Sequence, residues 1–195
     1  MKALYFATSS IWKFQQAKAY LRQFGINLVR ADIELPESRS EDVIEIAKEK
    51  AAFAYEQLQQ PVIVIDGAFH IKALNGFPKT MVKFNEKYLG ARGILKLMED
   101  ATDRAYEWPN VLCYKDDKTE KCFTGHIRGT ITTNLPANAE ANDFGLIQIP
   151  TGYAKTFSEM SEEEMQHFTK YVWQPAIFSE FRDWIAKTKL KPQPK

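Results

Sequence analysis

The sequence has little of what marks several common classes of protein. Its two cysteines are too few for a disulfide-rich secreted domain. No apolar run has the length of a membrane-spanning helix, and the apolar stretch at the amino terminus is too short for a signal peptide. The net charge is only +1, so no global field attracts nucleic acid or an anionic membrane. We therefore expect a cytoplasmic protein that binds neither.

The two cysteines, Cys113 and Cys122, lie on what read as neighbouring strands. A disulfide between them is geometrically conceivable, but no feature of the sequence demands one. Because buried cysteines of cytoplasmic proteins are ordinarily reduced, we favour two free thiols in the core.

The pattern that is present is that of an α/β protein. The apolar fraction of 45% is that of a globular chain rather than a disordered one. Apolar strands alternate with amphipathic helices in the first third of the chain, which predicts an α/β layer with parallel central strands. The strands are expected at residues 3–7, 27–31 and 62–65, and the helices at 11–24 and 40–59. Two short helices (82–90 and 92–98), two β-rich runs (105–114 and 119–128), a loop (134–142) and two more helices (161–172 and 175–187) follow.

A hydroxyl-rich turn, Thr8-Ser9-Ser10, leads from the first predicted strand into the first helix. Backbone amides at a helix amino terminus, together with Lys13 in the first turn, make a plausible phosphate cradle. The turn has no glycine and so is no Walker loop. Ser10 is equally an ordinary helix cap, which is the interpretation we favour for that residue.

Two acidic residues are expected near the same edge of the sheet. Asp66 ends the third predicted strand, and Glu37 lies in the loop after the second. Ligands of parallel α/β sheets collect beyond the carboxyl ends of the strands. Two carboxylates without cysteine or histidine partners suit Mg²⁺ better than zinc. Taken singly, Asp66 could be a turn former and Glu37 a solvated loop acid, but together they favour a site for Mg²⁺ and a nucleotide.

Several short motifs, in this order and spacing, resemble the inosine triphosphate pyrophosphatase family, whose enzymes act on non-canonical purine nucleoside triphosphates. The resemblance covers nearly the whole chain, from Leu4 to about Phe181, and depends on the succession of the motifs rather than on any one of them. The motifs are Ala-Thr-Ser-Ser-Ile-Trp-Lys (7–13), Leu-Pro-Glu (35–37), Val-Ile-Asp-Gly (64–67), Ala-Leu-Asn-Gly-Phe-Pro (73–78), Phe-Thr-Gly…Gly-Thr-Ile (123–131) and Asp-Phe-Gly…Pro-Thr-Gly-Tyr (143–153).

The resemblance implies roles for individual residues. It implies triphosphate binding by the first turn, a metal-binding glutamate at Glu37 and an acidic catalytic centre of which only Asp66 remains, since Ile65 stands where the family has glutamate. The catalytic residues implied are Asp66 and Lys13, and the metal ligands are Glu37 and Asp66. The substrate-binding residues implied are Thr8, Ser9, Ser10, Lys13, Lys48, Lys83, Phe144, Thr169 and Lys170.

The second half of the chain departs from the family pattern. Leu146 stands where the family has an aromatic residue that stacks on the base, and the aspartate beside it is missing. The family's Ser-His-Arg, which grips the purine, corresponds to Thr169-Lys170-Tyr171. The base-reading groups are thus replaced, whereas most of the phosphate-binding groups are retained.

The resemblance implies an elongated α/β fold with a central mixed, twisted sheet, helices on both faces and a cleft between two lobes. We expect one domain over residues 1–188, with a middle lobe at roughly 80–135 and a flexible basic tail at 189–195. We also expect a homodimer and an Mg²⁺-dependent hydrolase that splits a nucleoside triphosphate into monophosphate and pyrophosphate, with altered base preference. The alternative is a pseudoenzyme that binds nucleotide or a protein through the inherited cleft.

Overall fold

A mixed eight-stranded sheet forms the centre of the computed structural model, which describes residues 3–136 and 143–188. The strands lie in the order β2-β1-β3-β6-β4-β5, and β7 pairs with both β6 and β8. Strands β1, β2 and β3 are parallel, and β6 runs antiparallel to β3. The bounds are β1 Leu4–Ala7, β2 Leu28–Ala31, β3 Val62–Gly67, β4 Phe69–Ile71, β5 Pro78–Lys79, β6 Ala105–Lys115, β7 Glu120–Ile131 and β8 Gln148–Pro150.

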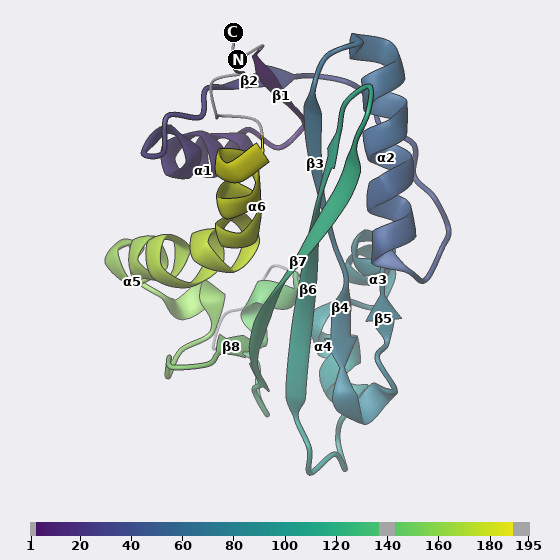
Figure 1. The fold of residues 1–195 in the computed structure, drawn as a ribbon. Coiled ribbons are helices and arrows are strands. Elements are labelled where there is room, and N and C mark those ends of the chain that lie inside the picture. Colours follow the sequence, from purple (N-terminus) through teal and green to yellow (C-terminus); the bar gives the residue numbers. More distant parts are fainter. Residues whose placement is uncertain (1–2, 137–142, 189–195) are drawn as a thin grey trace, which may run out of the picture.

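Helices cover both faces of this sheet. Figure 1 shows α2 on one face and α1 and α6 on the opposite one. The predicted α/β class, with a mixed sheet and helices on both faces, is confirmed. The α-helices are α1 Ile11–Arg22, α2 Val43–Leu58, α3 Val82–Tyr88, α4 Gly90–Leu97, α5 Glu162–Phe168 and α6 Gln174–Thr188, and the short 3₁₀ helices are η1 Lys72–Leu74, η2 Phe144–Leu146 and η3 Phe157–Glu159.

Large side chains fill one face of the sheet and small ones the other. Phe6 of β1 packs with Leu21, Phe178 and Phe181 of α1 and α6. On the opposite face, α2 presents alanines to β3 and β6. At Gly125 of β7 a Cβ atom would fall against the backbone of α6, so the absence of a side chain lets that helix lie directly on the strand.

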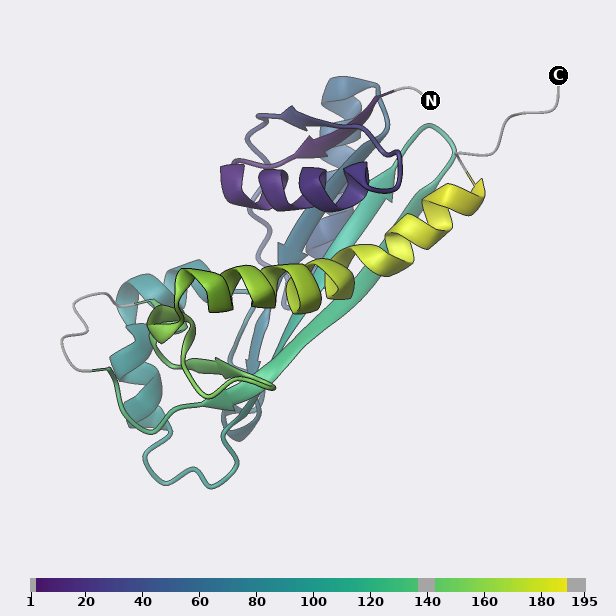
Figure 2. The ribbon, with the colours of Figure 1, turned by 90° about the vertical axis from the view of Figure 1, so that its left-hand side faces the viewer.

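A long hairpin joins the two ends of the molecule. Strands β6 and β7 pair along their whole length and extend from α2 at one end to β8 at the other (Figure 2). Cys113 and Cys122 lie directly opposite each other in this hairpin, with their Cα atoms 4.0 Å apart, and a disulfide joins them. The expectation of two free thiols was wrong, because the register of the hairpin brings the two residues face to face.

The last two predicted helices form one continuous segment. A π-helical turn, Thr169–Trp173, links α5 to α6, so the expected break at residues 173–174 is absent. Pro175 is the second residue of α6 and, because it has no N–H, donates no hydrogen bond within this continuous segment. The predicted tail at 189–195 and residues 137–142 of the predicted loop lie outside the described residues. The division into two lobes stays a prediction.

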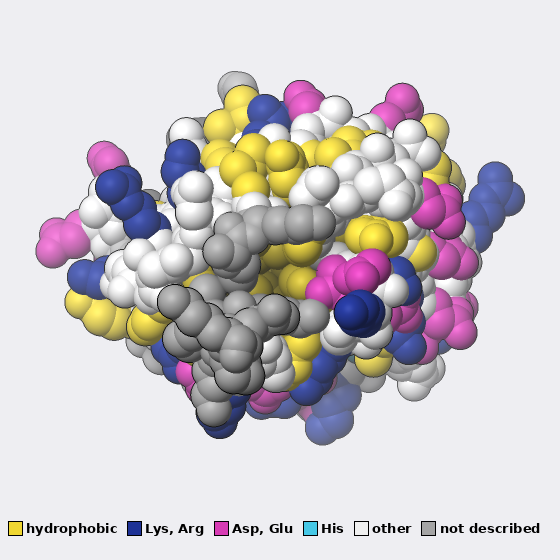
Figure 3. Space-filling view, turned by 45° about the horizontal axis from the view of Figure 1, so that its top comes forward, with side chains coloured by type: hydrophobic (Ala, Val, Ile, Leu, Met, Phe, Trp, Pro, Cys, Tyr) yellow, Lys and Arg dark blue, Asp and Glu magenta, His cyan; other side chains and the backbone are white. Residues whose placement is uncertain are grey.

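The surface carries charges of both signs. Figure 3 shows basic and acidic side chains separated by apolar and neutral ones, without a continuous basic area on the face that it presents. Among the described helices, none has the length and apolar character needed to cross a bilayer. Helix α3 exposes an apolar stripe of Met81, Phe84 and Tyr88. The homodimer stays a prediction, which light scattering can check.

Candidate functional site

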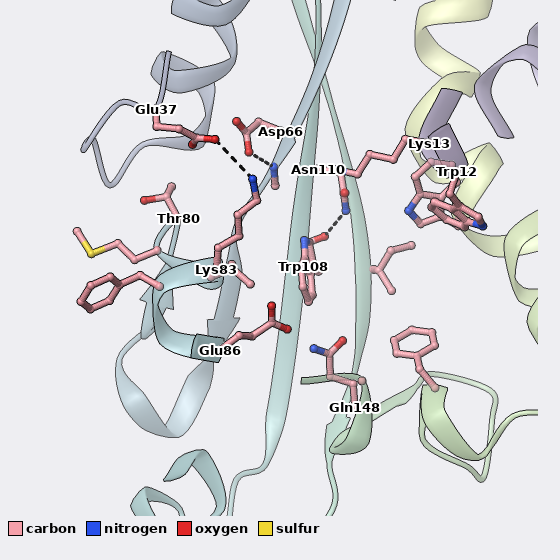
Figure 4. A pocket seen from close by; sticks show the side chains of 18 of the residues that line it. Trp12, Lys13, Glu37, Asp66, Thr80, Lys83, Glu86, Trp108, Asn110 and Gln148 are labelled. Atoms are coloured by element: carbon pink, nitrogen blue, oxygen red, sulfur yellow. Dashed lines mark hydrogen bonds and ion pairs between the residues drawn. The ribbon is translucent and has the colours of Figure 1, made fainter. Parts of the chain in front are cut away.

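One cleft of about 1190 Å³ collects side chains from most parts of the described chain. We divide its lining into two halves. The polar half consists of Lys13, Glu37, Lys50, Asp66 and Lys83, and the aromatic half consists of Trp12, Trp108, Phe157, Phe168 and Trp173. Figure 4 shows Glu37 and Lys83 across the cleft from Lys13 and Trp12, with Asp66, Asn110 and Trp108 between them.

Asp66 enters the cleft because β3 leaves the core as it ends. Val62, Ile63 and Val64 are buried, and the strand becomes partly exposed from Ile65 onward. One oxygen of Asp66 accepts the backbone N–H of Gly67 at 2.8 Å, and the other lies 2.5 Å from Lys50 Nζ. Both carboxylate oxygens are therefore held in place, which fixes the orientation of the acid.

Glu37 converges on the same lysine from a different segment. Lys50 Nζ lies 3.5 Å from Glu37 Oε2, and Lys83 Nζ lies 3.5 Å from Glu37 Oε1. The Lys50 side chain is only 11% exposed, whereas Glu37 is open to solvent. The two predicted acids, Glu37 and Asp66, thus converge on one group, the ammonium of Lys50, which lies between them.

Lys50, rather than the predicted Lys48, is the lysine that α2 contributes. Buried positions of α2 recur at Val43, Ile46, Ala47 and Ala54, and Lys50 belongs to the same stripe. Lys48 is two residues away, on the opposite side of the helix, and is exposed outside the cleft. A lysine inside the apolar stripe of a helix was the signal that could have identified Lys50.

Lys13 reaches the polar half from the first turn of α1. Burial lowers the pKa of its ammonium group from the ordinary value of 10.5; Asp66 opposes that shift, and Lys83 and Lys50 reinforce it. The preceding turn caps the helix: Ser10 Oγ accepts the N–H of Lys13 at 3.2 Å, and Thr8 Oγ1 accepts that of Ser10 at 3.1 Å. The interpretation of Ser10 as a helix cap is confirmed, and Thr8, Ser9 and Ser10 do not line the cleft.

The aromatic half is built from indole and phenyl rings of distant segments. Trp12 of α1 and Trp173 of the π-helical turn lie 4.9 Å apart, measured between ring centroids. Phe157 and Phe168 meet edge to face at 4.9 Å, and Trp108 of β6 is backed by Phe69 at 5.0 Å. These rings form apolar walls on which a flat aromatic ligand could stack.

Of the residues predicted in the second half of the chain, only Thr169 lines the cleft. Phe144 is fully buried against Phe69 in the core, and Lys170 is exposed and lies over the ring of Tyr171. The structure therefore does not bring Phe144 or Lys170 to the site. The π-helical turn explains the position of Lys170, since it places Thr169 and Trp173 inward and leaves the two residues after Thr169 outside.

The whole pattern of motifs has a match among known families. The model of the Ham1 family matches residues 4–170 of the chain. The chain belongs to the Ham1 family. The resemblance to inosine triphosphate pyrophosphatases is thereby confirmed, and the family is one of enzymes.

Curated members of the Ham1 family support this assignment over most of the chain. A dITP/XTP pyrophosphatase of Methanopyrus kandleri is 40% identical over 174 residues, which cover 87% of this chain and 92% of that protein. A second, from Saccharolobus solfataricus, is 34% identical over 169 residues, with 87% and 88% covered. The solved structure of a HAM1 protein from Coxiella burnetii shares the fold, with a TM-score of 0.79 at 17% identity over 96% of this chain and all of that one.

Sequence reasoning missed several side chains of the cleft. Besides Lys50 and the rings of the aromatic half, they are Arg39, Glu86, Asn110 and Gln148. Trp12 lies inside the motif at residues 7–13, but the sequence did not indicate a role for its side chain. Ile65, which replaces the family's glutamate, does not line the cleft and packs against the core beneath α1 and α6.

The two lysines of α2 provide a direct test of the polar half. We expect Lys50→Met to weaken the binding of inorganic tripolyphosphate by about tenfold or more, because a hydrogen bond to a charged group contributes about 1.5–3 kcal/mol. Lys48→Met is the matched control and should change the affinity less than about twofold, as expected for an exposed charge. Isothermal titration calorimetry measures both. Equal affinity losses in the two variants would contradict the assignment of Lys50.

Proposed function

We propose that the protein is a nucleoside triphosphate pyrophosphohydrolase, which converts a nucleoside triphosphate and water into a nucleoside monophosphate and pyrophosphate. The observation that carries this proposal is the division of one cleft into a polar half and an aromatic half. Three lysines suit a chain of phosphates, and stacked rings suit a base. The names of the relatives, dITP/XTP pyrophosphatases, support the same reaction.

The acid pair fits a divalent cation of the kind this reaction uses. The described residues contain no cluster of three or more His, Cys, Asp or Glu side chains, so they form no closed metal cage. Mg²⁺ is commonly held by one or two carboxylates together with water and substrate phosphates. Glu37 and Asp66, which converge within 3.5 Å of one Nζ atom, match that donor set. When bound, such an ion neutralises charge on the phosphates.

The residues of the polar half have separate roles in binding the phosphates and in orienting the attacking water. Lys13 and Lys83 approach the phosphates from opposite walls of the cleft, and Lys50 would exchange its carboxylate partners for phosphate oxygens. Asp66, whose orientation is fixed by Gly67, would orient the water that attacks the α-phosphorus. The new bond would join the water oxygen to that phosphorus, the proton of the water would pass to Asp66, and the bond to the bridging oxygen would break, so that pyrophosphate leaves.

Release of pyrophosphate from a panel of nucleoside triphosphates with Mg²⁺ tests this function. We expect turnover in the wild type and a loss of at least about a hundredfold in Asp66→Asn, the range typical of a lost acid–base group. Asp117→Asn, an exposed acid of the β6–β7 turn, is the control and should retain activity. If no nucleotide releases pyrophosphate but calorimetry shows tight nucleotide binding, the pseudoenzyme hypothesis would be correct and the enzyme hypothesis wrong.

The lowered pKa of Lys13 predicts the alkaline limit of activity. A lysine whose pKa is depressed loses its charge at a lower pH, so kcat/KM should fall on the alkaline side well before pH reaches the ordinary value of 10.5. Lys13→Arg keeps its charge at any of these pH values and should move that limb to higher pH. A pH profile of pyrophosphate release that is the same in both proteins would show that Lys13 does not set the limit.

We propose that the base preference of this chain differs from that of its relatives. Lys170 and Tyr171 take the places of the family's base-gripping pair, yet neither lines the cleft, and Tyr171 is 59% exposed. We infer that other side chains of the cleft read the base, and that the preference among bases is shifted accordingly.

A further inference from the structure

Gln148 is the most deeply buried polar side chain of the cleft. It is the first residue of β8, opposite Ile131 of β7, and is only 2% exposed. Its neighbour Ile147 points into the core and is fully buried. Figure 4 shows the amide of Gln148 directed into the cleft on the side of Glu86.

The amide of Gln148 has no hydrogen-bond partner among the described residues. The contrast is Gln174, also buried, whose amide nitrogen donates to the carbonyl and the side-chain oxygen of Gln16 at 3.2 and 3.1 Å. Among the described residues, Tyr106 Oη is the one fully buried polar side-chain atom without a partner, so the amide of Gln148 opens onto the cleft. A carboxamide that lines a cleft in this way is therefore suited to pairing with a polar ligand.

The surroundings of Gln148 indicate what kind of ligand this is. Trp108 lines the cleft, and so does Phe157, which belongs to η3, the short helix packed against β8. The phosphate-binding lysines belong to α1, α2 and α3, in other parts of the cleft lining. A carboxamide among aromatic side chains can hydrogen-bond to the edge of a base while the ring of the base stacks on those side chains.

We propose that Gln148 determines base specificity by pairing with the edge of a 6-oxopurine. Its Oε1 accepts the N1–H of the base, and its Nε2 donates to O6, so one carboxamide satisfies the adjacent donor and acceptor. This inference rests on the proposed function, since it takes the nucleotide's phosphates to lie in the polar half. It also accounts for recognition of the base without Lys170 and Tyr171.

Deoxynucleoside monophosphates test the proposal without requiring turnover. Titration calorimetry with dIMP, dGMP and inorganic tripolyphosphate compares the wild type with Gln148→Leu and Gln148→Glu. We expect Gln148→Leu to weaken dIMP at least about tenfold and to leave tripolyphosphate within about twofold. Gln148→Glu should raise the ratio of dGMP to dIMP affinity about tenfold, because a carboxylate accepts both N1–H and the 2-amino group that only guanine carries.

Gln174→Leu is the matched control, since it removes a buried amide outside the cleft, and it should leave the three affinities in their wild-type ratios. The proposal is overturned if Gln148→Leu binds dIMP as the wild type does, if it loses tripolyphosphate and dIMP equally, or if the wild type does not bind dIMP. Failure of the proposed function would be recognised by a different result, namely that no triphosphate releases pyrophosphate, whatever the three affinities are.

Discussion

The arrangement of the site depends on one charge cluster, in which the ammonium group of Lys50 lies between the carboxylates of Asp66 and Glu37. A partly buried ion of either sign is unstable without a partner, so Lys50 and Asp66 require one another, whereas the exposed Glu37 adds a longer contact at 3.5 Å. The three groups come from a strand end, a loop and a helix. A polyphosphate or cation that entered would replace contacts of this cluster, and we therefore propose that the chemistry takes place at the carboxyl end of β3.

The sheet explains why the cleft has a polar half and an aromatic half. Parallel strands β1, β2 and β3 end at one edge and deliver acids there, whereas the antiparallel hairpin of β6 and β7 continues past that edge. Trp108 lies on this continuation, and β8 adds Gln148 beside it.

Much of the fold was readable from the sequence because alternating apolar patterns and turn residues are local signals. Asp66 and Glu37 were found because strand ends of a parallel sheet converge, which is a topological rule. Lys48 was assigned and Lys50 was not considered, because motif spacing ignores the face of a helix, whereas burial depends on it. Phe144 and Lys170 were misplaced for a related reason: a π-helical turn and a shortened loop change which residues face inward, and neither leaves a periodic signal. Gln148 was missed since a single glutamine next to isoleucines has no pattern of its own.

The central claim is that Glu37 and Asp66 jointly hold the cation that accompanies a triphosphate. The most direct measurement is a crystal structure with Mn²⁺ and a nucleotide whose α–β bridge is an uncleavable imido group, recorded at the manganese absorption edge. The account predicts an anomalous peak within coordination distance of both carboxylates, with Lys50 turned to the phosphates. Manganese bound elsewhere, or phosphates among Trp108 and Phe157, would contradict it.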